Sequence, residues 1–123
     1  MEYTREKIKG VICLSEIKYK RIMLKVSGEA LAGEAHRGLD FDVINSVCAA
    51  IQECVDMGVQ VGLMVGAGNF WRGVKDGADK MQRSHADAMG MLGTVMNSIA
   101  VADALCKRGV DARVLSAVEM HKF

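Results

Sequence analysis

Several features that mark specialised classes of protein are missing from this sequence of 123 residues. Proline is absent, although average usage of about 5% would place roughly six in such a chain, and this absence points to no function. The net charge is +1, so neither the basic field of a nucleic-acid-binding protein nor an acidic tail is indicated. No apolar run approaches the roughly 18 residues of a membrane span, and "GVICLSEI" is too short and poorly flanked for a signal peptide.

The cysteines and histidines also lack a recognisable pattern. Cys13, Cys48, Cys54 and Cys106 show no C-x-x-C or histidine-paired spacing, which argues against a zinc site or a thioredoxin-type motif. The three histidines share no ligand spacing, so no metal site made of protein side chains is predicted. Cys48 and Cys54 fall in a helical pattern, where free cysteine behaves as a small buried hydrophobe. We expect a soluble, cytoplasmic protein without nucleic-acid or membrane partners.

What is present is an alternation of strand and helix patterns from Tyr19 onward. The alternation predicts a parallel α/β sheet with right-handed crossovers. Near-continuous apolar residues in the second strand are typical of a sheet covered on both faces, and hence of a three-layer α/β/α arrangement. Three strands leave open edges, so an incomplete domain is expected. The predicted elements are a strand at 19–26, a helix at 41–57, a strand at 59–66, a helix at 85–108 and a strand at 110–118.

Local signals support the first helix in particular. Asp40 or Asp42 can cap its amino terminus, and Gly58 supplies the left-handed residue after its last turn. Its apolar face is expected to contain Ile44, Val47, Ile51 and Val55.

Two glycine-bearing loops follow the first two predicted strands: "KVSGEA" and "GAGNFWRG". Ligands of open α/β sheets bind beyond the carboxyl ends of the strands, so neighbouring strands would bring both loops to one crevice. Each loop exposes backbone N–H groups and adds one cation, Lys25 or Arg72, as suits a polyphosphate. A lysine at a strand end can also simply extend its ammonium group into solvent.

Neither standard nucleotide motif is complete. After Gly66 and Gly68, Trp71 stands where the third glycine of the dinucleotide-binding fingerprint should be. Gly68 and Gly73 have the spacing of a P-loop, but Val74 replaces its lysine.

The second long helix raises three questions. Ser84 and Asp87 fit a capping box, although the Asp87 carboxylate could instead accept hydrogen bonds from a sugar. Gly90 and Gly93 each cost about 1 kcal/mol relative to alanine inside a helix, so close packing or approach of a ligand must offset that cost. The methionines at 89, 91 and 96 are expected as core filler.

Four blocks of the sequence resemble one known family. They are "YKRIMLKVSGEALAGE", "GVQVGLMVGAGNFWRG", "ADAMGMLGTVMNSIAVADAL" and "GVDARVLSAVEM". Together they resemble the amino-terminal half of the bacterial uridylate kinases (UMP kinases) of the amino-acid kinase superfamily. The signature is lysine–x–serine–glycine–glutamate after the first strand and glycine–asparagine–x–x–arginine–glycine after the second, together with "MGML".

This resemblance implies phosphoryl transfer from ATP, with Mg²⁺, to UMP in pyrimidine biosynthesis. Lys25 would be catalytic, and UMP would meet Ala67, which replaces a glycine of the family, and Asp87. The family is hexameric, activated by GTP and inhibited by UTP. The ATP phosphates would meet Lys25, Val26, Ser27, Gly28, Gly68 and Arg72. The loop linked in the family to GTP would be Gly33, Glu34, Ala35, His36, Arg37 and Gly38.

The resemblance also implies a division of the chain. Residues 1–17 match nothing in the family, and residues 18–123 correspond to the amino-terminal part of the kinase domain without its second half. We therefore expect the 123-residue polypeptide alone to be inactive or impaired. A dinucleotide-binding α/β module and a non-catalytic remnant remain alternatives.

The Ala67 methyl is tolerable if φ there is negative, whereas a positive φ would weaken acceptor binding.

Overall fold

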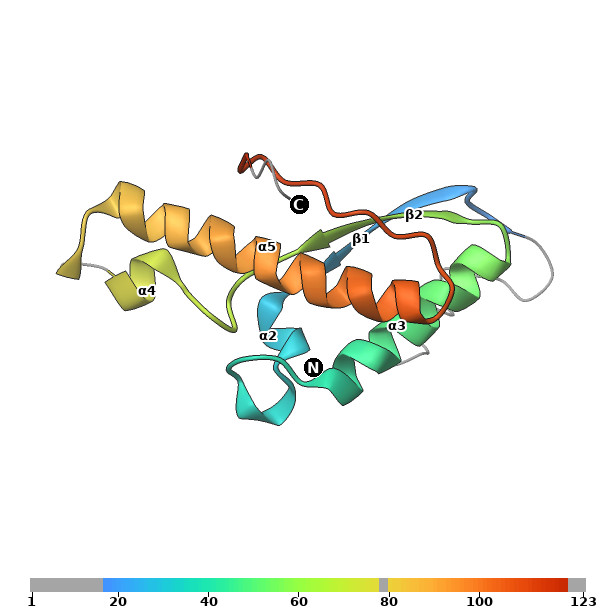
Figure 1. Ribbon diagram of the computed structural model, residues 1–123, viewed down its shortest axis with the longest axis horizontal. Helices are drawn as coiled ribbons and strands as arrows, with labels where there is room; N and C mark the ends of the chain where they lie inside the picture. The colour runs from blue at the N-terminus through green and yellow to red at the C-terminus, as the bar shows by residue number, and fades with distance from the viewer. Residues whose placement is uncertain (1–16, 78–79, 120–123) are drawn as a thin grey trace.

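Two parallel strands form a sheet on one side of the structure, and helices follow each of them in the chain (Figure 1). The computed structural model describes residues 17–77 and 80–119, so the expected extension at 1–17 lies outside the described residues except for Ile17. The elements are β1 (Arg21–Val26), α2 (Gly28–Leu31), the 3-10 helix η1 (Gly33–Ala35), α3 (Phe41–Asp56), β2 (Gln60–Val65), α4 (Gly73–Gly77) and α5 (Arg83–Lys107).

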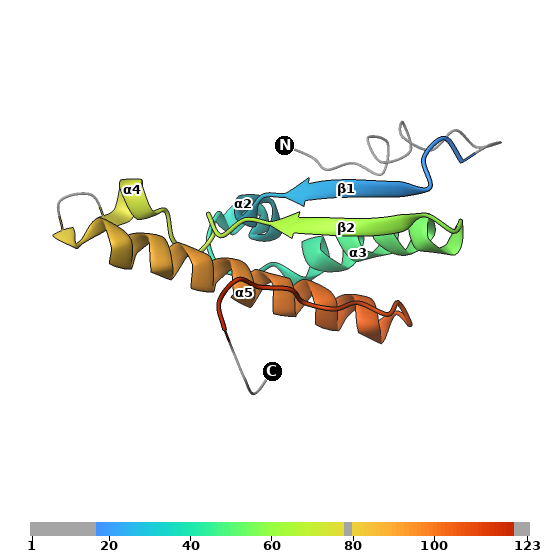
Figure 2. The same ribbon diagram turned by 90° about the horizontal axis from the view of Figure 1, so that it is seen from above.

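β1 and β2 pair in a register that matches Arg21 with Gln60 and Val26 with Val65. α3 connects the two strands, as a parallel pair requires a crossover. The predicted strand–helix–strand order and the parallel α/β class are therefore confirmed. Both strands end at the same edge of the sheet (Figure 2), so the loops that follow them begin side by side.

The third predicted strand, at 110–118, is not formed. Exposure alternates along this segment, with Val110, Ala112 and Val114 less exposed than the residues between them, yet the sheet contains β1 and β2 only. A cavity of about 630 Å³ is lined by β2, by residues 110–115 and by side chains of α3 and α5. Alternation identifies a half-buried extended segment, but a strand also needs ladder hydrogen bonds from a neighbour, which the pattern cannot specify.

The described helices cover one face of the sheet. Leu24, Leu63 and Val65 pack against the core on that face. The opposite face carries Met23 and Met64, which are 67% and 57% exposed, and no helix within the described ranges lies over it. The second helical layer that the apolar run of β2 predicts is therefore not among the described residues.

α3 begins and ends as its sequence indicates. Asp40 accepts hydrogen bonds from the N–H groups of Asp42 (3.0 Å) and Val43 (3.2 Å), and Gly58 follows the helix with φ 85°. Val55, at the end of its apolar face, is half-exposed. The core between α3, α5 and the sheet consists of Val26, Leu31, Ile44, Val47, Cys48, Ile51, Val101, Ala104 and Leu105.

α5 is the longest element, and its amino-terminal part extends with α4 beyond the carboxyl ends of the strands (Figures 1 and 2). By length and composition alone it could cross a membrane, but a core helix has the same properties, and α5 buries Ala86, Val95 and Val101, among others. Met89, Met91 and Met96 are 40%, 48% and 52% exposed, so the expectation that they fill the core is wrong. The described residues provide no layer for them to pack against.

Candidate functional site

The loops that follow β1 and β2 are in direct contact. The Gly66 N–H donates to the Val26 carbonyl at 2.9 Å, which continues the pairing past the strand ends. A Cβ built on Gly28 would lie 2.4 Å from Asn69 Oδ1, 2.6 Å from the Gly68 nitrogen and 2.8 Å from the Gly66 oxygen. Only glycine fits at position 28, so the two loops lie side by side, as predicted, and meet in a tight main-chain junction.

The predicted residues of the first loop differ in what they can offer a ligand. Lys25 is exposed near the end of β1, on the face of the sheet opposite α3 and α5. The Val26 side chain is buried in the core, so only its main chain could meet a nucleotide. Ser27 caps α2 by accepting from the Ala30 N–H at 3.2 Å, and its hydroxyl hydrogen can still be donated to a phosphate.

Arg72, the cation of the second loop, already has an anionic partner. Its guanidinium forms an ion pair with Glu29, whose carboxylate also lies beside Gly68. The Arg72 N–H donates to the Asp76 carboxylate at 2.9 Å, which holds the main chain of Arg72 at the start of α4. A phosphate that binds Arg72 must therefore replace Glu29 or share the Arg72 guanidinium with it.

Ala67 adopts a conformation that a methyl group tolerates. Among the described non-glycine residues only His36 has a positive φ, of 57°, so Ala67 lies outside the left-handed region. Its carbonyl accepts from the N–H groups of Phe70 (2.9 Å) and Trp71 (3.0 Å), which closes the turn after β2. Its methyl group faces Gly93 of α5, where an added Cβ would lie 2.9 Å away. This close packing against Ala67 explains why a glycine stands at position 93 inside the helix.

The Gly33–Gly38 loop lies against the second glycine loop. The Gly38 N–H donates to the Asn69 carbonyl at 3.1 Å, and the Asn69 side chain donates to the Gly38 carbonyl at 2.6 Å. A cavity of about 320 Å³ lies between the two loops, and its lining includes His36, Arg37, Arg72 and Lys75 together with Asp76. This excess of basic side chains suits an anionic ligand.

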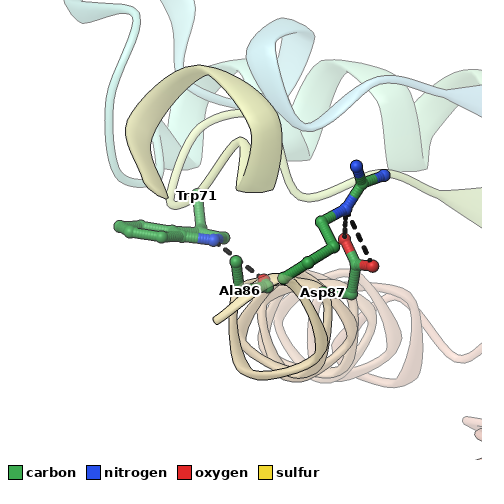
Figure 3. Close-up of polar contacts among 4 residues, drawn as sticks. Trp71, Ala86 and Asp87 are labelled. Atoms are coloured by element: carbon green, nitrogen blue, oxygen red, sulfur yellow. Dashed lines mark hydrogen bonds and ion pairs between the residues drawn. The ribbon is translucent and has the colours of Figure 1, made fainter. Parts of the chain in front are cut away.

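Asp87 is placed differently from the capping role that its sequence suggests. α5 begins at Arg83, with Gln82 as its N-cap residue and no side-chain capping bond. Asp87 lies one turn into the helix, where both carboxylate oxygens accept from Arg83 Nε at 3.1 Å (Figure 3). The capping-box prediction is wrong because the helix starts before Ser84. The pair is largely exposed, so Asp87 can exchange Arg83 for another partner.

Trp71 lies across the start of α5. Its indole N–H donates to the Ala86 carbonyl at 2.9 Å (Figure 3). A Cβ built on Gly77 would lie 3.1 Å from the indole ring, whereas one built on Gly90 would lie 4.0 Å away. The residue that breaks the dinucleotide fingerprint thus joins the loop after β2 to α5.

Sequence reasoning assigned no role to three residues that build this site: Glu29, Asn69 and Asn97. Asn69 and Asn97 are only 3% and 0% exposed and form hydrogen bonds with one another. Asn97 had a usable signal, since it is a lone amide in the apolar stretch "VMNSIAVA" and a buried amide requires partners. Glu29 belongs to the signature after the first strand, but no local pattern indicates its pairing with Arg72, a residue distant in the sequence.

Comparison with known proteins agrees with this architecture. The UMP kinase from Ureaplasma parvum is 34% identical with a TM-score of 0.76, over 85% of this chain and 46% of that chain. The UMP kinase from Bacillus anthracis is 32% identical with a TM-score of 0.67, over 73% of this chain and 37% of that chain. The chain thus spans less than half the length of either.

These similarities confirm the resemblance drawn from the sequence blocks. The model of the amino acid kinase family matches residues 20–122, which is most of the chain. The chain belongs to the amino acid kinase family.

Proposed function

We propose that this chain provides the phosphate-binding part of a UMP kinase, which transfers the γ-phosphoryl group of ATP to UMP and yields UDP for pyrimidine nucleotide biosynthesis. The observation that carries the proposal is the junction of the two glycine loops, where Gly28 meets the main chain of Gly66 and Gly68. This junction lies at the carboxyl ends of parallel strands, where α/β sheets bind ligands. Family membership and the two similar UMP kinases support it.

The proposed roles follow the two loops. ATP phosphates would meet Lys25, the main chain of Val26, and Ser27 and Gly28 from the first loop, and Gly68 and Arg72 from the second. UMP would meet the Ala67 N–H and the Asp87 carboxylate. Arg72 now pairs with Glu29, and Asp87 now pairs with Arg83. Arg72 and Asp87 would therefore exchange these partners for substrate.

The reaction requires no general base from the protein. The nucleophile is a phosphate oxygen of UMP, which is mostly ionised at pH 7 because its second pKa is near 6. Catalysis therefore reduces to positioning and neutralising charge. Lys25 is the residue proposed to neutralise the transferred group. One such contact at about 4 Å and an effective dielectric of about 20 corresponds to roughly 4 kcal/mol.

A magnesium ion would enter with ATP. Mg²⁺ usually keeps several waters and binds through substrate phosphates with one or two carboxylates. The part of the chain that the structure describes has no group of three or more side chains that could hold a metal ion, and the proposal assigns the ion to the nucleotide phosphates. Glu29, whose carboxylate lies beside Gly68, would be a ligand for such an ion, and the ion would neutralise phosphate charge.

Regulation and assembly are proposed from the resemblance. GTP would act through the Gly33–Gly38 loop, whose His36 and Arg37 line a basic cavity together with Gly68 and Arg72 of the proposed ATP site. Inhibition by UTP, a hexameric assembly and a cytoplasmic location belong to the same proposal.

The test is an assay of UMP-dependent ADP formation by the intact protein that carries these residues. Lys25→Met is expected to lower turnover by orders of magnitude, because the transition state loses its neutralising charge. The control is Lys20→Met, which removes the same charge from an exposed position at the other end of β1 and should change little. Absence of turnover in the wild type contradicts the proposed activity, and a loss below tenfold contradicts the role of Lys25.

Two further measurements separate the alternatives. The 123-residue polypeptide by itself is expected to turn over UMP poorly or not at all, and ordinary turnover would contradict that expectation. Thermal-shift measurements should show stabilisation by ATP or UMP and none by NAD(H). Stabilisation by NAD(H) alone would favour the dinucleotide-binding alternative.

A further inference from the structure

The amides of Asn69 and Asn97 form a reciprocal buried pair. Asn69 Nδ2 donates to Asn97 Oδ1 at 3.0 Å, and Asn97 Nδ2 donates to Asn69 Oδ1 at 2.7 Å. Asn69 lies in the loop after β2, and Asn97 lies in the middle of α5. The two side chains therefore fix the distance between the glycine loop and the longest helix.

Each amide also holds one main-chain carbonyl. Asn97 Nδ2 donates to the Gly66 carbonyl at 2.6 Å, and Asn69 Nδ2 donates to the Gly38 carbonyl at 2.6 Å. All four amide hydrogens are thus engaged, and both side-chain oxygens accept. A buried network in which every member is satisfied favours a single arrangement, because any rotation leaves a buried polar group without a partner.

The bond to Gly66 has a consequence for Ala67. The Gly66 carbonyl and the Ala67 N–H belong to one planar trans peptide unit and point in opposite directions. By holding the carbonyl, Asn97 determines where the Ala67 N–H points. Rotation of this peptide would turn the carbonyl oxygen toward the space that the N–H now faces.

We infer that Asn97 is a positioning residue, which through the Gly66 carbonyl aims the Ala67 N–H at the acceptor phosphate. Its partner Asn69 holds the Gly38 end of the Gly33–Gly38 loop in register with the same turn. The inference rests on the proposed function, because Ala67 is assigned to UMP only there. Asn97 itself touches no substrate.

Kinetics in the intact protein test this role. Asn97→Leu keeps the number and branching of the side-chain heavy atoms and removes both donors, so the KM for UMP should rise at least tenfold while the KM for ATP changes less than threefold. The matched control is Gln52→Met, which removes an amide donor to the Arg108 carbonyl (3.0 Å) in the contact between α3 and the end of α5, away from the loops. The control should leave both KM values unchanged.

Asn97→Asp provides a second variant of nearly unchanged shape in case the leucine variant does not fold. It replaces the Nδ2 donor that faces the Gly66 carbonyl by an acceptor oxygen. The KM for UMP should again rise while the KM for ATP changes little. Equal KM values for UMP in either folded variant and the Gln52→Met control would overturn the inference. A parallel rise in both KM values would also overturn it, because that result indicates general loosening.

Hydrogen exchange separates this inference from the proposed function. The N–H groups of Gly38, Phe70 and Trp71 are hydrogen-bonded within the two loops and should exchange at least tenfold faster in Asn97→Leu than in the Gln52→Met control. Rates are compared with those of α3 amides, which report global stability. A wild type without UMP turnover contradicts the proposed function only, whereas unchanged loop exchange contradicts the positioning role whatever the activity.

Discussion

Gly93 of α5 and Ala67 of the loop after β2 face one another so closely that a Cβ on Gly93 would lie 2.9 Å from the Ala67 Cβ. Two small residues therefore set the approach of α5 to the candidate site. Gly90, one turn earlier, has no such neighbour, since an added Cβ there would meet only Trp71 at 4.0 Å.

Alanine at these two glycines should have opposite effects. Gly93→Ala should lower the free energy of unfolding by about 1–3 kcal/mol, because overpacking outweighs the gain in helix propensity. Gly90→Ala should raise it by up to about 1 kcal/mol. Urea denaturation measures both. Adding Ala67→Gly should recover much of the loss in Gly93→Ala, and an additive double variant would show that the two residues do not interact.

The ion pair of Arg72 and Glu29 predicts competition between Glu29 and a phosphate ligand. Arg72→Gln should weaken the binding of pyrophosphate, measured by calorimetry without Mg²⁺, about tenfold or more. Glu29→Gln should strengthen it severalfold, because the guanidinium no longer needs to leave a carboxylate. Lys107→Gln is the control, since its ion pair with Asp103 lies at the carboxyl end of α5, away from the carboxyl ends of the strands (Figure 2). Weaker binding in Glu29→Gln would contradict the competition.

The buried thiols predict a loss of stability at alkaline pH. Burial raises the pKa of both Cys48 and Cys54 above the ordinary value of 9.0, and Glu53 adds to the effect at Cys54. Above pH 9 the unfolded chain loses these protons first, so the free energy of unfolding should fall as pH rises through 9 and beyond. The slope is at most about 1.4 kcal/mol per pH unit for each thiol.

Urea denaturation between pH 7 and about 10.5 checks this slope. A Cys48→Ala, Cys54→Ala double variant should lose stability less steeply above pH 9, while Cys106→Ser, at an exposed thiol, should follow the wild type. Parallel curves for the wild type and the double variant would exclude the contribution of the buried thiols.

The cap at Asp40 predicts a specific loss of stability. Asp40→Ala should cost about 1 kcal/mol, because the N–H groups of Asp42 and Val43 lose their acceptor. Asp40→Asn should retain most of that stability, since an amide oxygen can also accept. Thermal denaturation ranks the three proteins, and an alanine variant as stable as the asparagine variant would show that the cap contributes little.

Much of the architecture was predictable because its signals are local. The Asp40 cap, the left-handed Gly58 and the apolar face of α3 each depend on residues within a few turns of one another. The same applies to the order of strands and helices, which forces a parallel pair and brings the two loops after β1 and β2 to one edge. The contact of Gly28 with the second loop follows from that topology.

Other features depend on partners far away in the chain. The segment at 110–118 shows strand-like alternation from Val110 to Val114 but no pairing with β2, and the ion pair of Arg72 with Glu29 joins two separate loops. No local pattern specifies such pairings.

The sequence by itself determined the parallel α/β unit and the two glycine loops, because hydrophobic periodicity and capping act over short distances. Only the tertiary structure decided how Asn69 meets Asn97, how Arg72 meets Glu29 and how closely Ala67 approaches Gly93. Each of these pairs joins separate elements, and a buried amide or an ion pair gains its partner only when the packing of those elements places both groups within hydrogen-bonding distance.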